Sequence, residues 1–382
     1  MGSIIPELNM KELISLSHKY GADSDYVLAG GGNTSWKSDE LMAVKASGTE
    51  LGSITKDGFV TLSMEKLRTI RATQYPDNRE EREERALEDL MNSRLPGQKG
   101  RPSVESLLHA IIPDKYVVHT HPALVNGLTC SRDGQKMAEK LFPDNCIWIP
   151  LVDPGYILAK TIDNEMSRWM NSHDGKLPDY IFLANHGVFL WGADSEEVDR
   201  KYKSLFTTLK SVCSNSNAVT IDKQEIVSSG LLQSIGELAG SNGNAIFTTG
   251  NEIRSALESR KTIENLQQSL SPDHIVYMGH TPLVCDNLPE DKLLEQIKKE
   301  YIQFSDRWGK EPKSVLILGK GFISIGNSKK GSETARLLML DAIRVIRISA
   351  SFGGPKFMSV EKVNFINTWE VEKYRAKLSD NG

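Results

Sequence analysis

The first half of the chain alternates between hydrophobic patterns of helices and of strands. Residues 10–22 repeat apolar positions at helical spacing and stop at a glycine. Residues 26–38 predict a strand that runs into a glycine-rich turn, and residues 41–54 predict a second strand with a turn. The charged segment 64–95 predicts helices interrupted at Pro76.

The same alternation continues through the next hundred residues. Residues 104–112 predict a short helix, residues 116–125 a buried strand, and residues 146–160 a further strand and turn. Residues 180–194 predict a strand hairpin, and the helix that follows begins at a Ser195 cap with acidic residues in its first turn. This order of elements is typical of an α/β fold.

A polar segment rich in Asn and Ser, residues 214–224, interrupts the pattern. Such a composition is typical of a connection between domains. We therefore predict a first domain over residues 1–219 and a second, smaller α/β domain over residues 220–382.

Two segments of the second domain resemble segments of the first. Residues 113–125 (PDKYVVHTHPALV) match 272–284 (PDHIVYMGHTPLV), and residues 180–198 are echoed by 314–334. The second domain is therefore either a degenerate copy of the first, or alike only in the general pattern of strand, turn and capped helix. Only one of three histidines is retained in this register, which aligns His119 with Met278, His121 with His280, and His186 with Lys320.

The composition is that of an ordinary globular protein, with 39% hydrophobic and 25% charged residues and a net charge of -4 among 382 residues. It favours a small-molecule partner over a nucleic acid or a membrane. Four scattered cysteines without a CxxC pair fit a reducing cytoplasm. The sequence shows neither a signal-peptide pattern at its start nor a run of about 18 uninterrupted apolar residues.

Two histidines stand at the polar end of a predicted buried strand. His119 and His121 are two residues apart, and residues at that spacing in a strand point to the same face. With His186 from a neighbouring turn and Glu105 they offer the ligands of a catalytic zinc site, which keeps a position open. The alternatives are buried histidines with structural roles, and a competing or supporting part for His109, one helical turn after Glu105.

Three short motifs have the composition of an anion site. GGGNTS at residues 30–35 offers backbone amides and the side chains of Asn33 and its two neighbours. KASG at residues 45–48 and RPS at residues 101–103 add further donors and positive charge. None has the spacing of a Walker loop or a dinucleotide-binding fingerprint, and for GGGNTS taken alone a simple turn is the alternative.

Taken together, these motifs resemble the class II aldolase/adducin family. GGGNTS, KASGTE, PSVE ending at Glu105, HTHP and ANHGVFLWG come in the family's order over about residues 10–215. The resemblance implies an α/β fold of three layers, αβα, around a central mixed or antiparallel sheet. Through GGGNTSWK, DPGY and WEVEKYR it extends to the aldolase half of bacterial bifunctional rhamnulose-1-phosphate aldolase/dehydrogenase proteins. No dinucleotide-binding motif follows, so we expect a stand-alone aldolase.

The resemblance also implies a role for each matching residue. The divalent ion, usually zinc, would be held by His119, His121 and His186, with Glu105 as a possible fourth ligand and as the acid/base. The phosphate-binding positions would be Asn33, Ser47, Gly48 and Ser103. Some family members have two serines before the glutamate where this chain has Ser103 and Val104, so the implied phosphate pocket has one hydroxyl fewer.

The implied reaction is cleavage of a ketose 1-phosphate, with L-rhamnulose 1-phosphate as the first candidate, to dihydroxyacetone phosphate and lactaldehyde. Zinc would stabilise the enediolate that cleavage leaves, and Glu105 would shuttle its proton. Tyr156 in DPGY, with Asp153 behind it, is our candidate for the proton donor to the aldehyde, a role that family members often give to a neighbouring subunit. The alternative is that DPGY merely forms a turn.

Two other functions stay open. The same metal site would serve as an epimerase, dehydratase or decarboxylase of a related phosphate. A non-enzymatic binding role, as in adducin, would not require Glu105 and three histidines, and their presence argues against it. We expect a homo-oligomer, either a ring of four or a dimer whose second domains complete a pseudo-fourfold arrangement. An independent helper domain is the alternative for residues 220–382.

Overall fold

The computed structural model describes residues 5–214, 216–222 and 227–368, and the chain forms two compact units. Unit 1 comprises residues 1–125 and 134–212, and unit 2 comprises residues 126–133 and 213–382. The short segment 126–133 belongs to unit 2 because its backbone bonds there, with the amides of Arg132 and Asp133 donating to the carbonyls of Gly354 and Phe352.

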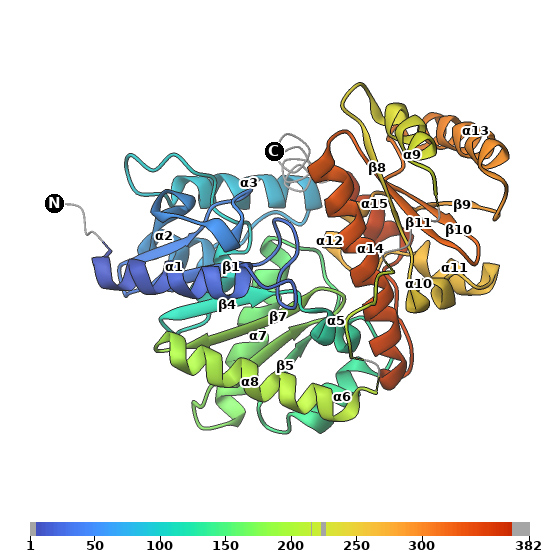
Figure 1. Ribbon diagram of the computed structural model, residues 1–382. Coiled ribbons are helices and arrows are strands. Elements are labelled where there is room, and N and C mark those ends of the chain that lie inside the picture. The colour runs from blue at the N-terminus through green and yellow to red at the C-terminus, as the bar shows by residue number, and fades with distance from the viewer. Residues whose placement is uncertain (1–4, 215, 223–226, 369–382) are drawn as a thin grey trace. The chain divides into compact units, whose positions relative to one another are not determined.

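Unit 1 is built on a mixed sheet of seven strands in the order β3-β2-β1-β4-β7-β6-β5 (Figure 1). The strands are β1 (Asn33–Lys37), β2 (Leu41–Lys45), β3 (Phe59–Ser63), β4 (Tyr116–Thr120), β5 (Cys146–Ile149), β6 (Tyr180–Leu183) and β7 (Gly187–Gly192). Neighbours are antiparallel except β5 and β6, which run parallel. The predicted α/β fold with a mixed central sheet is confirmed.

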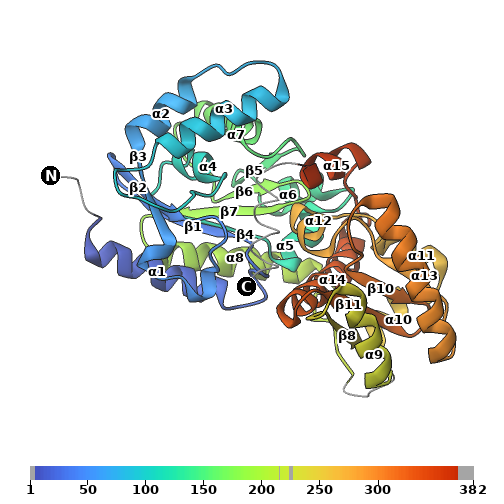
Figure 2. The same ribbon diagram turned by 90° about the horizontal axis from the view of Figure 1, so that it is seen from above.

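Helices cover both faces of this sheet. They are α1 (Glu7–Gly21), α2 (Met64–Ala72), α3 (Arg79–Asn92), α4 (Ser106–Ile111), α6 (Gly134–Leu141), α7 (Tyr156–Ser172) and α8 (Ser195–Val212). The short helix α5 (Ala123–Thr129) begins in unit 1 and ends in the segment that belongs to unit 2. Figure 2 shows α1 and α8 on one face and α2, α3, α4 and α7 on the other. Leu67, Leu108 and Ile162 from the second group pack on Val117 and Ile181 of the sheet, which excludes water from one side of the strands.

The first strand begins later than the sequence pattern predicted. Residues 26–32 lie outside any strand, and β1 starts only at Asn33, after the glycines. A Cβ on Gly32, whose φ is +64°, would lie 2.9 Å from the His119 carbonyl oxygen. The turn therefore approaches β4 closely because it carries a glycine at this position. Asn33 pairs with His119 across β1 and β4 as a result.

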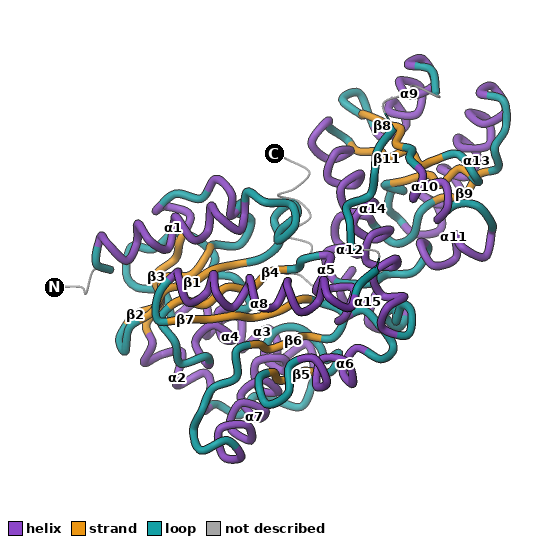
Figure 3. The backbone as a smooth tube through the Cα atoms, turned by 60° about the horizontal axis from the view of Figure 1, so that its bottom comes forward, coloured by secondary structure: helices purple, strands orange, loops and turns teal. Residues whose placement is uncertain are grey.

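Unit 2 contains a smaller sheet of four strands in the order β8-β11-β10-β9 (Figure 3). The strands are β8 (Asn244–Thr248), β9 (Leu283–Cys285), β10 (Ser314–Ile317) and β11 (Gly321–Gly326). The helices are α9 (Ser229–Gly236), α10 (Asn251–Ala256), α11 (Arg260–Leu266), α12 (Pro272–Met278), α13 (Glu290–Trp308), α14 (Lys329–Ser349) and α15 (Val360–Thr368). Leu293 and Ile297 of α13 pack on Val315, Ile317 and Ile323 of the sheet. No helix among the described residues of the chain combines the length and the apolar character of a membrane span.

The sheet of unit 2 repeats the pairing of half the sheet of unit 1. The strands β8, β11, β10 and β9 follow the order and directions of β4, β7, β6 and β5, with two antiparallel pairs and then a parallel pair. In each sheet the two of these strands that come last along the chain form a hairpin that is followed by a long helix, as the sequence match between residues 180–198 and 314–334 predicted. Half of one sheet is thus present twice in the chain.

The other sequence match was wrong. Residues 272–278 form α12, whereas the segment aligned with them contains strand β4. The helix is favoured because Pro272 occupies its first turn, where the fixed φ of proline suits a helix. The structural counterpart of β4 is β8, whose last residue, Thr248, pairs with Phe322 as Thr120 pairs with Val188.

This pairing gives the equivalent positions in the two sheets. Phe247, Thr249 and Lys320 stand where unit 1 has His119, His121 and His186, respectively. His280, which the sequence match had aligned with His121, lies instead against Trp308 with a ring separation of 3.6 Å. The described part of unit 2 therefore has no imidazole at any of the three equivalent positions.

Candidate metal centre

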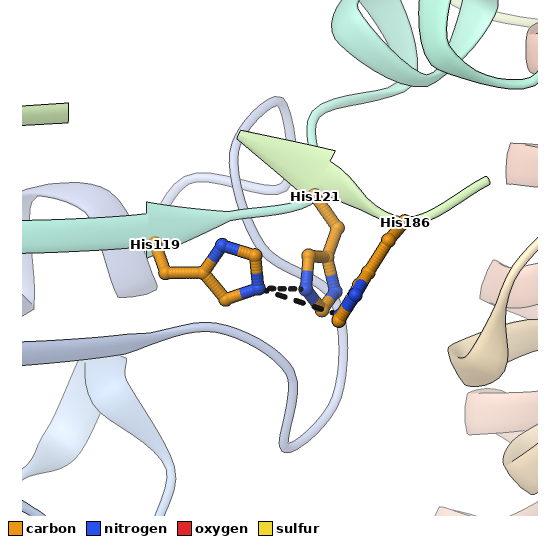
Figure 4. Close-up of side chains that lie close together, drawn as sticks. All are labelled: His119, His121 and His186. Carbon is orange, nitrogen blue, oxygen red and sulfur yellow. Dashed lines mark hydrogen bonds between the residues drawn. The ribbon is translucent and has the colours of Figure 1, made fainter. Parts of the chain in front are cut away.

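Three histidine side chains converge at one end of β4 and β7. His119 lies in β4, His121 follows the end of that strand rather than lying within it, and His186 occupies the turn between β6 and β7. Figure 4 shows the three rings pointing toward one another. The Nε2 atom of His119 lies 2.9 Å from Nε2 of His121 and 3.4 Å from Nε2 of His186. These separations bracket the roughly 3.3 Å expected between two nitrogens bound tetrahedrally to one zinc ion.

The orientation of His119 is fixed by β7. Its Nδ1 atom lies 3.0 Å from the carbonyl oxygen of Val188, and its ring stacks on Phe189 with centroids 4.1 Å apart. Because a carbonyl only accepts hydrogen bonds, Nδ1 carries the proton and the Nε2 lone pair faces the other histidines. A metal-binding imidazole requires this tautomer.

The position of His186 depends on the two residues beside it. Asn185 has a φ of 56°, in the left-handed region that Asn tolerates better than most side chains. A Cβ on Gly187 would lie 2.4 Å from the Thr120 carbonyl oxygen and 2.7 Å from the His121 ring. The turn can therefore bring His186 against the end of β4 only because residue 187 is a glycine.

Glu105 supplies a carboxylate to the same place. It is the N-cap residue of α4, and its Oε1 atom lies 3.3 Å from Nε2 of His119 and 3.4 Å from Nε2 of His186. Oε2 accepts a hydrogen bond of 2.5 Å from Nδ2 of Asn33. Burial by itself raises the pKa of Glu105, but the facing histidines outweigh it and hold that pKa well below its usual range. The carboxylate is therefore ionised at neutral pH.

These side chains fit a divalent cation. Oε1 of Glu105 is buried without a hydrogen-bond partner among the described residues, although it faces two imidazole nitrogens. The ligand atoms of the three histidines lie within 4.8 Å of one another. Three neutral imidazoles and a carboxylate are a ligand set typical of zinc, so the unsatisfied oxygen and the convergent nitrogens have a common explanation.

The residues predicted to bind phosphate lie on neighbouring segments. Ser103 is placed beside Asn33, with its Oγ 3.5 Å from Nδ2 of Asn33, and that Oγ also accepts from the Glu105 amide at 3.3 Å. Ser47 belongs to the adjoining loop, where its amide donates to the carbonyl of Arg101 at 2.7 Å. Gly48, which follows it, has a φ of 83°. Asn33 and Ser103 thus meet Glu105 directly, while Ser47 and Gly48 are held beside them through the backbone.

Tyr156 lies in a different environment. Its hydroxyl donates to the carbonyl of Thr73 at 2.8 Å, and its ring packs edge-on against Tyr75 at 4.7 Å. The carboxylate beside it is Glu83, which accepts from its amide at 2.9 Å, whereas Asp153 pairs with Arg79. Burial raises the pKa of the Tyr156 hydroxyl. The structure does not bring this hydroxyl to the histidines of its own chain.

His109 is a functional candidate whose partner was not identified from sequence. It is fully buried, with Nδ1 2.7 Å from Oγ of Ser35 and Nε2 in short contact with Oδ1 of Asn33. It is therefore not a competing metal ligand. The spacing of four residues after Glu105 correctly predicted that His109 lies on the helix that Glu105 begins. Its contact with Asn33 joins that helix to β1, and β1 takes its place in the sheet by pairing with β4.

The chain is similar in sequence to a known family and to one curated relative. The sequence model of the class II aldolase and adducin N-terminal domain matches residues 11–210. An uncharacterized oxidoreductase, YuxG of Bacillus subtilis (strain 168), is 26% identical over 415 aligned positions that cover 97% of this chain. The chain spans 58% of the length of that relative.

Two solved structures are similar to somewhat more than half of the chain. One is the N-terminal class II aldolase domain of a conserved protein from Thermoplasma acidophilum, with 26% identity, 55% of this chain and 96% of that chain covered, and a TM-score of 0.45. The other is L-fuculose-1-phosphate aldolase from Thermus thermophilus, with 14% identity, 54% and 93% covered, and a TM-score of 0.35.

Proposed function

The chain belongs to the class II aldolase and adducin family, and on that premise we propose that unit 1 is a divalent-metal-dependent aldolase that cleaves a sugar phosphate. The observation that carries this proposal is the convergence of three imidazoles on one another, two of which face the Oε1 atom of Glu105. A divalent cation would satisfy this buried carboxylate oxygen and the lone pairs of the imidazoles that face it at 3.3 and 3.4 Å.

His119, His121 and His186 would hold the ion, with zinc as the metal best suited to these ligands. The ion supplies Lewis-acid stabilisation of negative charge on the substrate oxygens during carbon–carbon cleavage. Glu105 is the acid/base, or a fourth ligand before substrate enters. Because Asn33 occupies Oε2, the atom that exchanges a proton with the substrate is Oε1.

Asn33, Ser47, Gly48 and Ser103 would bind the phosphate. Amide and hydroxyl donors from neighbouring loops suit a phosphate because its oxygens only accept. The distance of 3.5 Å between Asn33 and Ser103 supports their acting on one group. A ketose 1-phosphate is therefore the proposed substrate class, and L-rhamnulose 1-phosphate, giving dihydroxyacetone phosphate and lactaldehyde, is its first candidate.

Tyr156 remains a prediction as the proton donor to the aldehyde. Its hydroxyl is bonded to Thr73 within its own chain, so we propose that it would serve the site of a neighbouring subunit in a homo-oligomer. A cytoplasmic location is proposed as well, since all four cysteines are free and buried.

The test combines metal content with aldol cleavage of L-rhamnulose 1-phosphate. The proteins are the wild type, His119→Ala, and His280→Ala as a matched control from unit 2. We expect about one zinc per chain in the wild type and in His280→Ala, with both metal and cleavage lost in His119→Ala. Metal without cleavage would redirect the proposal to the epimerase, dehydratase or decarboxylase reactions. Absence of metal from the wild type would refute it.

A further inference from the structure

We propose that His109 is a positioning residue that holds the Asn33 amide in the orientation required by Glu105 and by the phosphate. Four residues form the hydrogen-bonded relay in the order Ser35, His109, Asn33 and Glu105. The hydrogen bonds of the relay are seen in the structure, whereas its effect on catalysis rests on the proposed aldolase function.

The first step concerns burial. Ser35 and His109 are fully buried, and Asn33 is 4% exposed. Water is therefore excluded from the bonds between them, and each polar atom must be satisfied by the next residue of the relay. The ring of His109 is also confined by Phe189, with centroids 5.4 Å apart. The imidazole has a single position in which both of its nitrogens have partners.

The second step assigns the donors. Oδ1 of Asn33 only accepts, so Nε2 of His109 must carry a proton and donate to it. A neutral imidazole then accepts at Nδ1, and the donor is the hydroxyl of Ser35 at 2.7 Å. Burial holds the pKa of His109 well below its usual range. This agrees with the neutral form that the contacts require.

The third step follows from the amide of Asn33. With Oδ1 directed at His109, Nδ2 must face Glu105, where it donates to Oε2 at 2.5 Å. The flipped amide would set its oxygen against a carboxylate oxygen, and would set its NH2 group against a protonated Nε2. The carboxylate of Glu105 therefore excludes the flipped amide, and the Nε2–H donor of His109 supports the same orientation from the other side of Asn33.

The relay has two consequences for the site. Holding Oε2 of Glu105 leaves Oε1 directed at the histidines, where proton exchange is proposed. The same Nδ2 group lies 3.5 Å from Ser103, at the proposed phosphate position. Residues that orient a catalytic group in this way are worth about 10- to 100-fold in activity or metal affinity.

Two substitutions of similar length separate positioning from simple packing. In His109→Gln the side-chain NH2 can replace Nε2–H as the donor to Asn33, whereas His109→Met fills the space without a donor. We expect His109→Gln to keep kcat within about threefold of the wild type, and His109→Met to lose about 10- to 100-fold in kcat. Zinc content should be unchanged in both, because His109 binds no metal. His274→Gln, at a buried histidine of unit 2, controls for the loss of an imidazole.

A second measurement does not depend on activity. Nitrogen-15 NMR of the wild-type imidazoles should show His109 with a proton on Nε2 and none on Nδ1. Equal kcat values for His109→Gln and His109→Met, or a proton on Nδ1, would overturn the relay. If the wild type cleaves no sugar phosphate, the aldolase proposal fails while the tautomer still decides the relay. If His109→Met does not fold, the tautomer and His109→Gln decide it.

Discussion

His119 and Phe189 are cross-strand partners in β4 and β7, and their rings stack at an interplanar angle of 15° with centroids 4.1 Å apart. Phe189 also touches the ring of His109 on the neighbouring helix. One aromatic side chain therefore restrains both a proposed metal ligand and the residue proposed to orient Asn33.

Replacement of Phe189 by Leu should weaken metal binding without abolishing it. The bond from Nδ1 of His119 to the Val188 carbonyl is retained, but the ring loses the surface that limits its rotation. We expect a loss of about tenfold in zinc affinity and a stability cost of about 1.5 kcal/mol or less. Competition with a chromophoric chelator measures the affinity. Phe182→Leu, in buried strand β6, is the control, and equal loss in the two variants would contradict the stacking argument.

The backbone conformation at Asn185 should determine the direction in which the His186 side chain points. Glycine adopts a φ of 56° without strain, whereas a β-branched residue does not. We expect Asn185→Gly to retain its zinc, and Asn185→Val to lose about 1–3 kcal/mol of stability together with metal affinity. Urea unfolding and zinc titration measure the two effects. Asp174→Val, at a φ of 52° in an exposed loop, imposes similar strain away from the histidines and should leave metal binding intact.

Lys37 should make stability depend on pH. Its Nζ atom is buried without a hydrogen-bond partner among the described residues, and burial lowers its pKa to about 7. The unfolded chain therefore holds this proton more tightly than the folded chain, and the penalty is largest below about pH 7 and shrinks as the pH rises toward about 10.5. It changes by at most about 1.4 kcal/mol per pH unit.

We therefore expect Lys37→Met to be more stable than the wild type at neutral pH, with an advantage that falls as the pH rises. The measurement is the difference in the free energy of unfolding between the two proteins, obtained by urea unfolding at several values between about pH 7 and 9. The difference is used because the buried cysteines, whose pKa values are raised, contribute equally to both proteins. An advantage that stays constant, or grows, would show that Lys37 is not buried in its neutral form.

Sequence alone predicted which candidate ligands lie together better than it predicted the structure around them. His119, His121, His186 and Glu105 were identified because spacing and a family resemblance constrain them directly, and all four lie together. The partner of His109 was missed because it sits on a strand whose start was misplaced by the preceding glycines. Residues 272–278 were misaligned because an apolar run bounded by turn residues has the same pattern in a buried helix as in a strand. Tyr156 remains unresolved for a different reason, since its proposed partner belongs to another subunit.

Chelation of the metal should affect the two sheets differently. A ligand that binds only the folded state stabilises it in proportion to its affinity, and the ligands proposed here all belong to unit 1. Hydrogen exchange of the β4 and β7 amides should therefore accelerate when the metal is removed, while that of β8 and β11 should not. Acceleration in both sheets would mean that the metal has a wider role.

The repeated half-sheet allows the histidine positions of unit 1 to be compared with the equivalent positions of unit 2. Unit 2 keeps the pairing order of β4, β7, β6 and β5 but places Phe247, Thr249 and Lys320 at the three equivalent positions. The hairpin and its long helix form there with no imidazole at these positions, so this order of strand pairing does not in itself require histidines.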